Sequence, residues 1–202
     1  MKHSEIFISA IVAVTLLTSC GNGTGTDVKA NADSANTVNI DSAKLKDTSA
    51  ANPVHMTDLK QDSVFAVTAA DGGMLEVALG KLAVKKATNA SVKKFAAQMV
   101  TDHSKANLEL KTLASEKHLV IPASMSDKCQ KVLSDLEAKT GSDFNKAYAE
   151  QMVKDHKDTI DLFQKEAKDG IDAQVTAWAK NTLPTLEHHL MMAEEVQKQL
   201  EK

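Results

Sequence analysis

The sequence predicts an all-α fold, a bundle of four long helices in the part of the chain from residue 57 to residue 202. Aromatic residues make up only 3% of the chain, whereas Ala, Leu, Val and Met are plentiful, and this composition suits helices packed through small side chains. Apolar residues recur at helical spacing over four long stretches. Only a few helix-breaking residues separate the first stretch from the second and the third from the fourth, which indicates two helical hairpins.

The chain begins with the pattern of an export signal, predicted to be a lipoprotein signal peptide over residues 1–19. A short charged start precedes an apolar run at 6–17, which is too short to span a bilayer because that needs about 20 residues. The run ends in Leu17-Thr18-Ser19-Cys20, which resembles a bacterial lipobox. The resemblance implies cleavage before Cys20 and a lipid anchor on Cys20 that holds the protein on a membrane. The alternative is an ordinary signal peptide with a chance cysteine.

Residues 20–56 are predicted to be a disordered tether behind the lipidated Cys20. They are dominated by Gly, Ser, Thr, Asn, Asp, Ala and Lys, and they contain no aromatic residue. Their isolated apolar residues show no sustained period, so too little apolar surface is available to offset the entropy of ordering. The tether leads into the bundle domain at residues 57–202.

The four helices are expected at 61–88, 91–116, 143–169 and from 172 to the C-terminus. Connections of a few residues, around Asn89 and Gly170, fold each pair into an antiparallel hairpin. The segment between the two hairpins contains a short amphipathic piece at 126–139 and is long enough to travel the length of the bundle. Two hairpins joined by a long crossover form the ferritin-like arrangement.

Each helix carries an ionisable residue near its middle, on the face that its apolar residues mark: Glu76, His103, His156 and His189. The middles of helices of similar length lie at the same height whichever way the helices run, so we expect these side chains to meet inside the bundle. Three imidazoles and one carboxylate form a metal-binding set for copper, zinc or iron. Asp102 and Asp155, each just before a histidine, are expected to accept hydrogen bonds from the imidazoles.

Methionines share the faces of these histidines. Met99 and Met152 each precede a histidine by four residues, and Met192 follows one by three. Thioether with imidazole suits copper, especially Cu(I). Methionine at this spacing is also common core filler, and the buried His, Glu and Asp residues can form a purely structural network that fixes helix register. Both interpretations stay open.

The helices resemble a family of bacterial exported proteins, domain of unknown function 4142, from about residue 62 to residue 193. The resemblance rests on motifs in all four helices: Gly72-Gly73-Met74-Leu75-Glu76-Val77, Met99-Val100-Thr101-Asp102-His103, Met152-Val153-Lys154-Asp155-His156, and Leu183-Pro184-Thr185-Leu186 followed by His189-Leu190. It implies a ferritin-like fold and makes Glu76, both Asp-His pairs and His189 pattern positions. Together with the lack of Asp after Cys20, it places the anchor on the periplasmic side of the outer membrane.

The two Met-Val-x-Asp-His segments are also similar to a second ferritin-like family, domain of unknown function 305, whose Met/His-rich helices are linked to copper. This likeness covers short segments only, Met99 to His103 and Met152 to His156. It implies copper among the candidate metals.

Several classes of function find no support in the sequence. The net charge is −3, with 24 basic and 27 acidic residues and no basic stripe, which argues against nucleic acid as a partner. A di-iron enzyme of this fold needs Glu-x-x-His, which does not occur, and neither Gly-x-Ser-x-Gly nor His-Glu-x-x-His is present. No small-molecule substrate is indicated, and self-association stays open. The sequence therefore predicts either a metal-binding module or a non-catalytic interaction or stress protein in the cell envelope.

Overall fold

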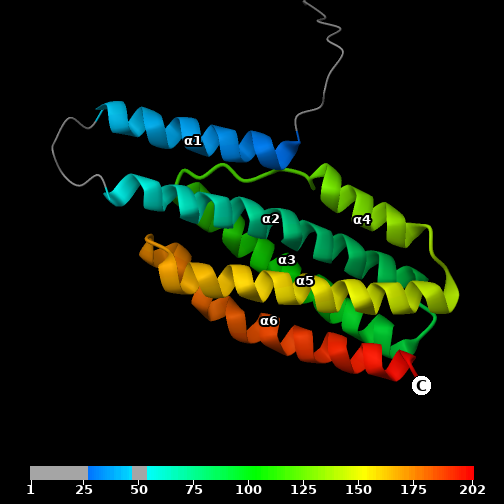
Figure 1. The fold of residues 1–202 in the computed structure, drawn as a ribbon. Coiled ribbons are helices and arrows are strands. Elements are labelled where there is room, and N and C mark those ends of the chain that lie inside the picture. The colour runs from blue at the N-terminus through cyan, green and yellow to red at the C-terminus, as the bar shows by residue number, and fades with distance from the viewer. Residues whose placement is uncertain (1–26, 47–53) are drawn as a thin grey trace, which may run out of the picture.

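The computed structural model describes the backbone of residues 27–46 and 54–202, and the side chains of residues 27–41 and 60–202. This part of the chain contains helices and no strands (Figure 1). The helices are α1 (Val28–Lys46), α2 (Val54–Lys86), α3 (Ala90–Glu116), α4 (Asp127–Glu137), α5 (Gly141–Asp169) and α6 (Ala173–Leu200). The signal peptide at 1–19, the anchor at Cys20 and the remaining ends of the tether lie outside the described residues and stay predictions.

Four of these helices form the predicted bundle. Helices α2 and α3 form one hairpin and α5 and α6 the other, and the hairpins meet where α2 packs against α5 and α3 against α6 (Figure 1). The crossover between them carries α4, which packs against α2 and α5. The all-α bundle is therefore confirmed, whereas a closer relation to ferritin-like proteins stays a prediction.

Helix α1 corrects the prediction of a disordered tether over 28–46. It packs on α2, with Ala32 and Asn36 buried. The Asn36 side chain donates from Nδ2 to the Val120 carbonyl oxygen at 2.8 Å and accepts from the Val120 amide with Oδ1 at 2.7 Å. Because the contacts of α1 are with α2 and with the crossover, which lies far along the chain, the composition and period of this segment alone do not reveal the helix.

Side-chain oxygens cap the starts of α3, α4 and α6, whereas Thr140 before α5 makes no such bond. Asn89 Oδ1 accepts from the amides of Ser91 and Val92 at the start of α3, and Asp172 Oδ1 accepts from those of Gln174 and Val175 at the start of α6. Ser126 caps α4 in the same way through its bond from the Cys129 amide. These bonds satisfy amides that the helices leave unpaired, so each helix begins where its capping residue lies.

The apolar core is divided into two clusters by a polar layer. One cluster contains Leu79, Phe95, Met99, Tyr148 and Met152, among others. The second contains Phe65, Leu110, Phe163, Ala179 and Leu186, among others. The predicted ionisable residues of α3, α5 and α6 fall between the two clusters on each helix, and Glu76 lies at the same boundary on α2. The structure thus places all four at one level of the bundle.

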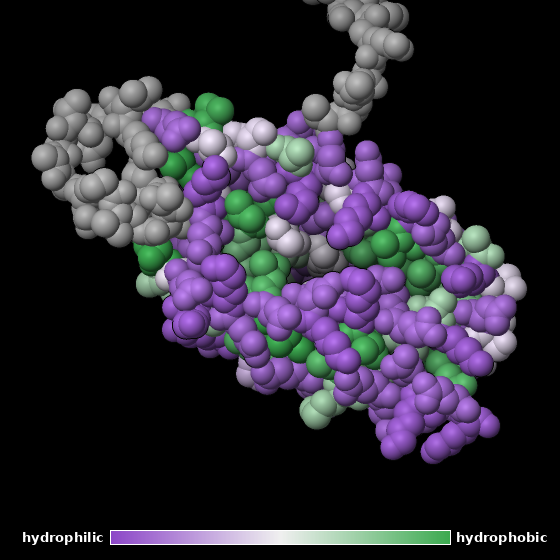
Figure 2. All heavy atoms as spheres, viewed as in Figure 1, coloured by the Kyte–Doolittle hydropathy of each residue, from purple (hydrophilic) through white to green (hydrophobic). Residues whose placement is uncertain are grey.

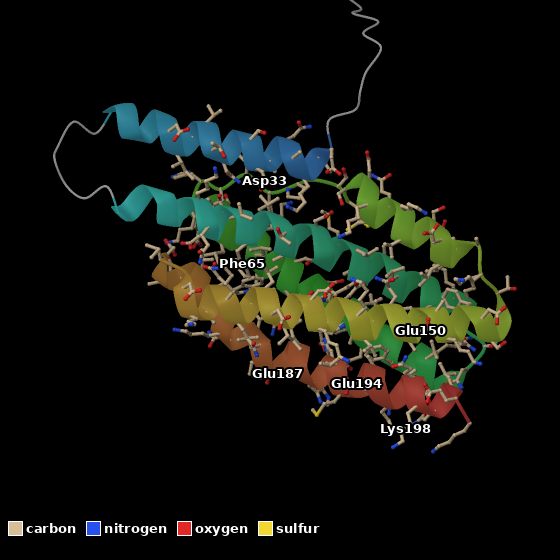
Figure 3. The ribbon with its side chains drawn as sticks, in the orientation of Figure 1. Asp33, Phe65, Glu150, Glu187, Glu194 and Lys198 are labelled. Atoms are coloured by element: carbon tan, nitrogen blue, oxygen red, sulfur yellow. The ribbon has the colours of Figure 1, made fainter. Side chains whose placement is uncertain are left out.

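One segment of α2, Lys60–Lys86, is long and apolar enough by composition to cross a membrane. In the bundle, 67% of its most apolar window is buried against other helices, as in the core helix of a globular domain. Phe65 illustrates this, because it lies inside the bundle in edge contact with Phe163, whereas Glu187 and Glu194 lie on the outside (Figure 3).

Candidate metal centre

Three imidazoles from three helices meet at the centre of the bundle. His103, His156 and His189 are each at most 5% exposed, and their ring centroids are separated by 5.5, 5.2 and 5.4 Å. One ring nitrogen of each lies within 4.8 Å of a ring nitrogen of the other two. The rings therefore form a nearly equilateral triangle inside the protein.

Each imidazole is fixed through one of its two nitrogens. Nδ1 of His103 donates to Glu76 Oε2 at 2.9 Å, and Nε2 of His189 donates to Asp102 Oδ2 at 2.8 Å. Nδ1 of His156 donates to the carbonyl oxygen of Met152 at 2.8 Å. Because all three acceptors are oxygens without a proton to give, they assign the donating nitrogen of each ring.

The second nitrogen of each imidazole is buried and has no hydrogen-bond partner among the described residues. These atoms are Nε2 of His103, Nε2 of His156 and Nδ1 of His189. In the neutral rings these nitrogens carry the lone pairs, since the other nitrogen donates. An imidazole anchored to an oxygen on one side and unpaired on the other is the arrangement of histidine ligands in metalloproteins.

Two glycines bring Glu76 close to His103. A Cβ at Gly80 would lie 2.8 Å from Val100 Cγ2 and 3.1 Å from the Ala96 carbonyl oxygen, and a Cβ at Gly73 would lie 2.1 Å from Asn107 Oδ1. These positions flank Glu76 on the side of α2 that faces α3. Their lack of a side chain lets the helices approach closely, so a buried carboxylate reaches the imidazole.

Between pH 4.5 and 6.5, Glu76 and His103 both carry charge when no metal is present. Burial raises the pKa of Glu76, but the adjacent His103 outweighs burial and the net effect is a lowered pKa. Burial likewise lowers the pKa of His103, but Glu76 outweighs it and the pKa is raised. The two side chains therefore form a buried ion pair, which costs little only because each compensates the other.

The other two histidines are neutral at pH 7. Burial lowers the pKa of His156, with the charge of His103 acting in the same direction. Burial also lowers the pKa of His189, to about 4, despite its bond to Asp102. Two imidazoles thus offer lone pairs without first losing a proton, whereas a protonated His103 would have to release its proton before it could act as a ligand.

The predicted site residues do not all contribute in the expected way. Asp102 contacts an imidazole, that of His189 on the neighbouring helix. Asp155 contacts none: its Oδ1 accepts from Gln151 Nε2 at 2.8 Å, its Oδ2 is buried without a partner among the described residues, and burial raises its pKa to about 6. Glu76 contacts the donating nitrogen of His103 and stands outside the group of three nitrogens. It acts on the orientation and charge of the imidazole.

The methionines belong to the apolar core. Met99 and Met152 are fully buried in the first cluster, and Met192 packs against it. Met152 contacts His156 through its carbonyl oxygen. A role of their sulfur atoms in binding a metal stays a prediction.

A cavity of about 610 Å³ reaches this centre, with Glu76, His103 and His189 on its wall. It continues past Asp155 to Phe163 and Trp178, and residues from all six helices or their starts line it. The surface is hollowed near the middle of the molecule, between α2 and α5 (Figure 2). The sequence did not predict this cavity, because its wall residues share no period or motif.

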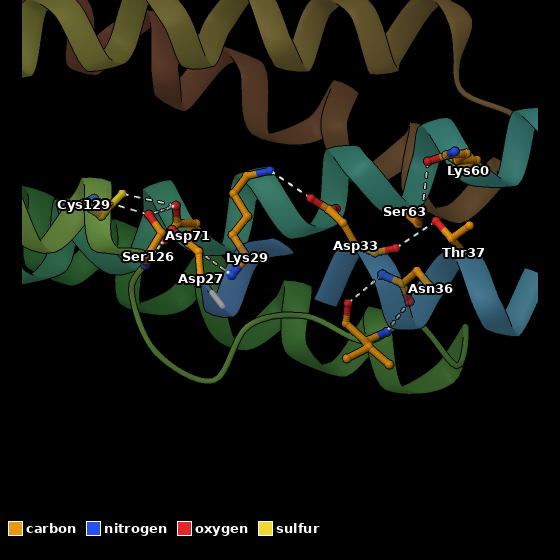
Figure 4. A network of polar contacts seen from close by, with 11 residues as sticks. Asp27, Lys29, Asp33, Asn36, Thr37, Lys60, Ser63, Asp71, Ser126 and Cys129 are labelled. Atoms are coloured by element: carbon orange, nitrogen blue, oxygen red, sulfur yellow. Dashed lines mark hydrogen bonds and ion pairs between the residues drawn. The ribbon is translucent and has the colours of Figure 1, made fainter. Parts of the chain in front are cut away.

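A second polar cluster at the edge of the cavity was also missed. Asp71 accepts hydrogen bonds from the amide and hydroxyl of Ser126, both at 2.7 Å, and lies 3.2 Å from Cys129 Sγ (Figure 4). Burial raises the pKa of the Cys129 thiol to about 11, so it is neutral. These contacts attach the start of α4 to α2.

The three unpaired nitrogens fit a transition-metal ion. Metal–nitrogen bonds of about 2.0–2.1 Å in tetrahedral geometry set the nitrogens roughly 3.3 Å apart, whereas one nitrogen of each ring lies within 4.8 Å of those of the other two, so the imidazoles need to approach one another by at most about 1.5 Å. Three protein ligands leave a fourth position open, as in catalytic and exchangeable zinc sites. His103 and His189 lie on the cavity wall, so a small molecule in the cavity lies beside these imidazoles.

Comparison with known proteins gives a family and no characterised relative. The family model described as Domain of unknown function (DUF4142) matches residues 45–196. No curated protein and no solved structure matches the chain. Since the family model covers about three quarters of the sequence, including α2, α3, α5, all but the last turn of α6 and every residue of the histidine centre, the chain belongs to the DUF4142 family.

Proposed function

We propose that this protein binds a transition-metal ion, copper, zinc or iron, through His103, His156 and His189. The observation that carries the proposal is the pairing of each imidazole in a group whose ring centroids lie 5.2–5.5 Å apart: one nitrogen is bonded to an oxygen, and the other is buried and has no partner among the described residues. Each buried nitrogen without a partner costs about 1–3 kcal/mol of stability, and an ion bound by all three nitrogens would remove this cost at each of them.

The donor set narrows the class of ion. Imidazole nitrogen suits zinc, copper, iron and nickel, whereas calcium and magnesium require a shell of oxygens. Glu76 and Asp102 orient two of the imidazoles and raise their basicity, as oxygens behind histidine ligands do. They also supply two negative charges against the charge of a divalent ion.

The test is calorimetric titration of the full, chelator-treated chain with Zn(II) and Cu(II), and with Cu(I) and Fe(II) under anaerobic conditions. We expect one ion per chain with a dissociation constant below about 1 μM. His189→Ala should weaken binding at least about tenfold. His188→Ala is the matched control, because this neighbouring histidine is exposed and is not part of the group of three. Equal effects of the two variants, or binding of no ion by the parent protein, would contradict the proposal.

A second candidate is a non-catalytic interaction or stress protein in which the same residues only hold helices together. The contacts that favour it are the bonds from Glu76 to His103, which join α2 to α3, and from Asp102 to His189, which join α3 to α6. In that case the histidine variants would lose about 1–3 kcal/mol of unfolding free energy, and no ion would bind to any of the proteins.

We further propose that the protein is a lipoprotein of the cell envelope, anchored through Cys20 on the periplasmic side of the outer membrane. The support is the Leu17-Thr18-Ser19-Cys20 motif after an apolar run. With α1 docked, the chain from Cys20 to Val28 spans at most about 26 Å, which keeps the bundle close to the membrane. Fatty-acid labelling in cells, followed by membrane fractionation, tests this: Cys20→Ser should abolish labelling, whereas Cys129→Ser should not.

A further inference from the structure

The cavity beside the histidine centre is elongated. His189 and Trp178 both line it, and they are separated by eleven residues of α6, about 16 Å along the helix. Its volume of about 610 Å³ lies within the range of sites that bind small organic molecules. The cavity therefore accommodates a molecule much larger than a water or a simple anion.

The two ends of the cavity differ in chemistry. At the far end, the rings of Phe163 and Trp178 lie 5.3 Å apart, with Phe65 packed against both. The near end is lined by Glu76, Asp155, His103 and His189, each of which has a buried polar atom without a hydrogen-bond partner among the described residues: Glu76 Oε1, Asp155 Oδ2, His103 Nε2 and His189 Nδ1. An occupant that matches both ends has an apolar body and a polar head.

Charge selects the kind of head. If the three imidazoles hold a divalent ion, the carboxylates of Glu76 and Asp102, which contact two of these imidazoles, offset its two charges. An anionic head gains no net attraction from such a site. The two other unpaired atoms at this end are carboxylate oxygens, which favour a head that carries an N–H donor.

We propose that the cavity binds an elongated, mostly apolar molecule ending in a neutral heteroaromatic nitrogen base, an azole. Its ring nitrogen takes the open position of the ion, its N–H donates to a carboxylate oxygen of Asp155 or Glu76, and its tail extends to Phe163 and Trp178. This ligand class rests on the proposed metal centre.

The experiment uses the full chain loaded with Co(II), whose visible spectrum reports the coordination of the ion. Trp178 is the single tryptophan of the chain, so its fluorescence reports the far end of the cavity. Imidazole should change only the Co(II) spectrum. 2-Undecylimidazole, which has the same head and a long alkyl tail, should change both signals and bind at least about tenfold more tightly, since each buried methylene adds up to about 0.8 kcal/mol. Laurate, with a similar tail and an anionic head, should bind more weakly.

A matched pair of variants tests the position of the tail. Thr182 lines the cavity between Trp178 and His189, and Thr182→Leu should weaken 2-undecylimidazole about tenfold without changing the affinity for imidazole or Co(II). Thr112→Leu is the control, because Thr112 is exposed and, like Thr182, donates to the carbonyl oxygen four residues earlier.

Failure of the parent protein to bind Co(II) would overturn both proposals. Binding of Co(II) with no preference for the tailed azole, or with laurate bound as tightly, would overturn this one alone.

Discussion

Two buried glutamates, one at the middle of the bundle and one near the α5–α6 turn, have opposite acid strengths. Glu76 is 3% exposed and Glu166 is 1% exposed, so burial disfavours the charge of both. Yet the pKa of Glu76 is lowered, whereas burial and the nearby Asp62 raise the pKa of Glu166 to about 7. The difference lies in the charged groups that act on them: three imidazoles lower the pKa of Glu76, whereas another acid, Asp62, raises that of Glu166.

The same difference separates a site for a ligand from a structural contact. At the α5–α6 turn, both carboxylate oxygens of Asp62 accept hydrogen bonds from the backbone, one from the amide of Ile171 and one from that of Asp172. Glu166 packs against Gly170 beside it, and near neutral pH it carries a proton for a large part of the time. At the bundle centre the carboxylates of Glu76 and Asp102 instead accept hydrogen bonds from imidazoles, and the neutral imidazoles keep the lone pair of their second nitrogen. Burial alone therefore identifies neither a functional acid nor a metal centre.

The largest expected effect comes from removing the acid at the centre. Glu76→Ala leaves His103 without its counter-charge inside the protein and should lower the unfolding free energy by about 3–5 kcal/mol in metal-free protein. Because the pKa of Glu76 is lowered in the folded protein, its charge stabilises the fold above pH 4.5, and this stability is lost at more acidic pH. Because the pKa of His103 is raised, its charge stabilises the fold below pH 6.5, and this stability is lost as the pH rises. Urea unfolding near pH 5.5 therefore shows the full effect.

Exposed glutamates provide the comparison for this measurement. Glu187→Ala on the outside of α6 should change the unfolding free energy by less than about 0.5 kcal/mol. A cost for Glu76→Ala no greater than that of Glu187→Ala would mean that the pair at the centre contributes nothing to stability.

Removing the other buried acid should have the opposite sign. Glu166→Gln keeps the shape of the side chain and removes its charge. The pKa of Glu166 is about 7 in the folded protein against 4.5 in the unfolded chain. The parent protein is therefore most stable below pH 4.5, and it loses about 3 kcal/mol of unfolding free energy as the pH rises through 7. The variant should therefore be more stable than the parent protein by about 2–3 kcal/mol at pH 8 and nearly equal to it at pH 4.5. Thermal unfolding at the two pH values measures this, and a destabilised variant at pH 8 would contradict it.

The close approach of α2 to α3, which creates the pair at the centre, can be tested with two alanines. Gly80→Ala places a Cβ against Val100 and the Ala96 carbonyl oxygen, so it should cost about 1–3 kcal/mol and weaken metal binding by moving Glu76 away from His103. Gly72→Ala meets nothing within 4 Å and should stabilise the helix by about 0.5–1 kcal/mol. Calorimetric unfolding and zinc titration of both variants separate helix propensity from helix spacing. Equal changes in the two variants would show that spacing has no role.

The sequence predicts the bundle and the meeting of the histidines well because both depend on helical period. His103, His156 and His189 interrupt apolar faces near the middles of three helices, and equal helix lengths then place them at one height. The hairpins follow from connections too short for any other path. Local pattern and overall fold agree here, so a single sequence is sufficient.

The sequence does not predict features that depend on contacts between distant segments. The contact of Asp102 with His189, the proximity of Glu166 to Asp62 and the cavity lined by Trp178 all join residues of different helices whose relative rotation no period specifies. Helix α1 is the clearest case. Only Ala32 and Asn36 are buried among its described side chains, so its position depends on polar contacts that composition does not report.

Asn36 is a buried polar residue without charge, and among the substitutions of buried polar residues its removal should have the smallest effect on stability. Its amide is 1% exposed and both of its bonds go to the backbone of Val120, whose residue is 40% exposed. Water can replace the lost amide at Val120, so Asn36→Ala should cost only about 1 kcal/mol, against several for a buried charge that loses its partner. The loss should appear as faster amide hydrogen exchange in α1, with the unfolding of α2 to α6 unchanged. Asn39→Ala, at an exposed position of the same helix, should leave exchange in α1 unaltered. If Asn36→Ala instead destabilised the whole bundle as much as Glu76→Ala, the number of bonds to a buried group, and not the charge of its partner, would decide the cost of removing it.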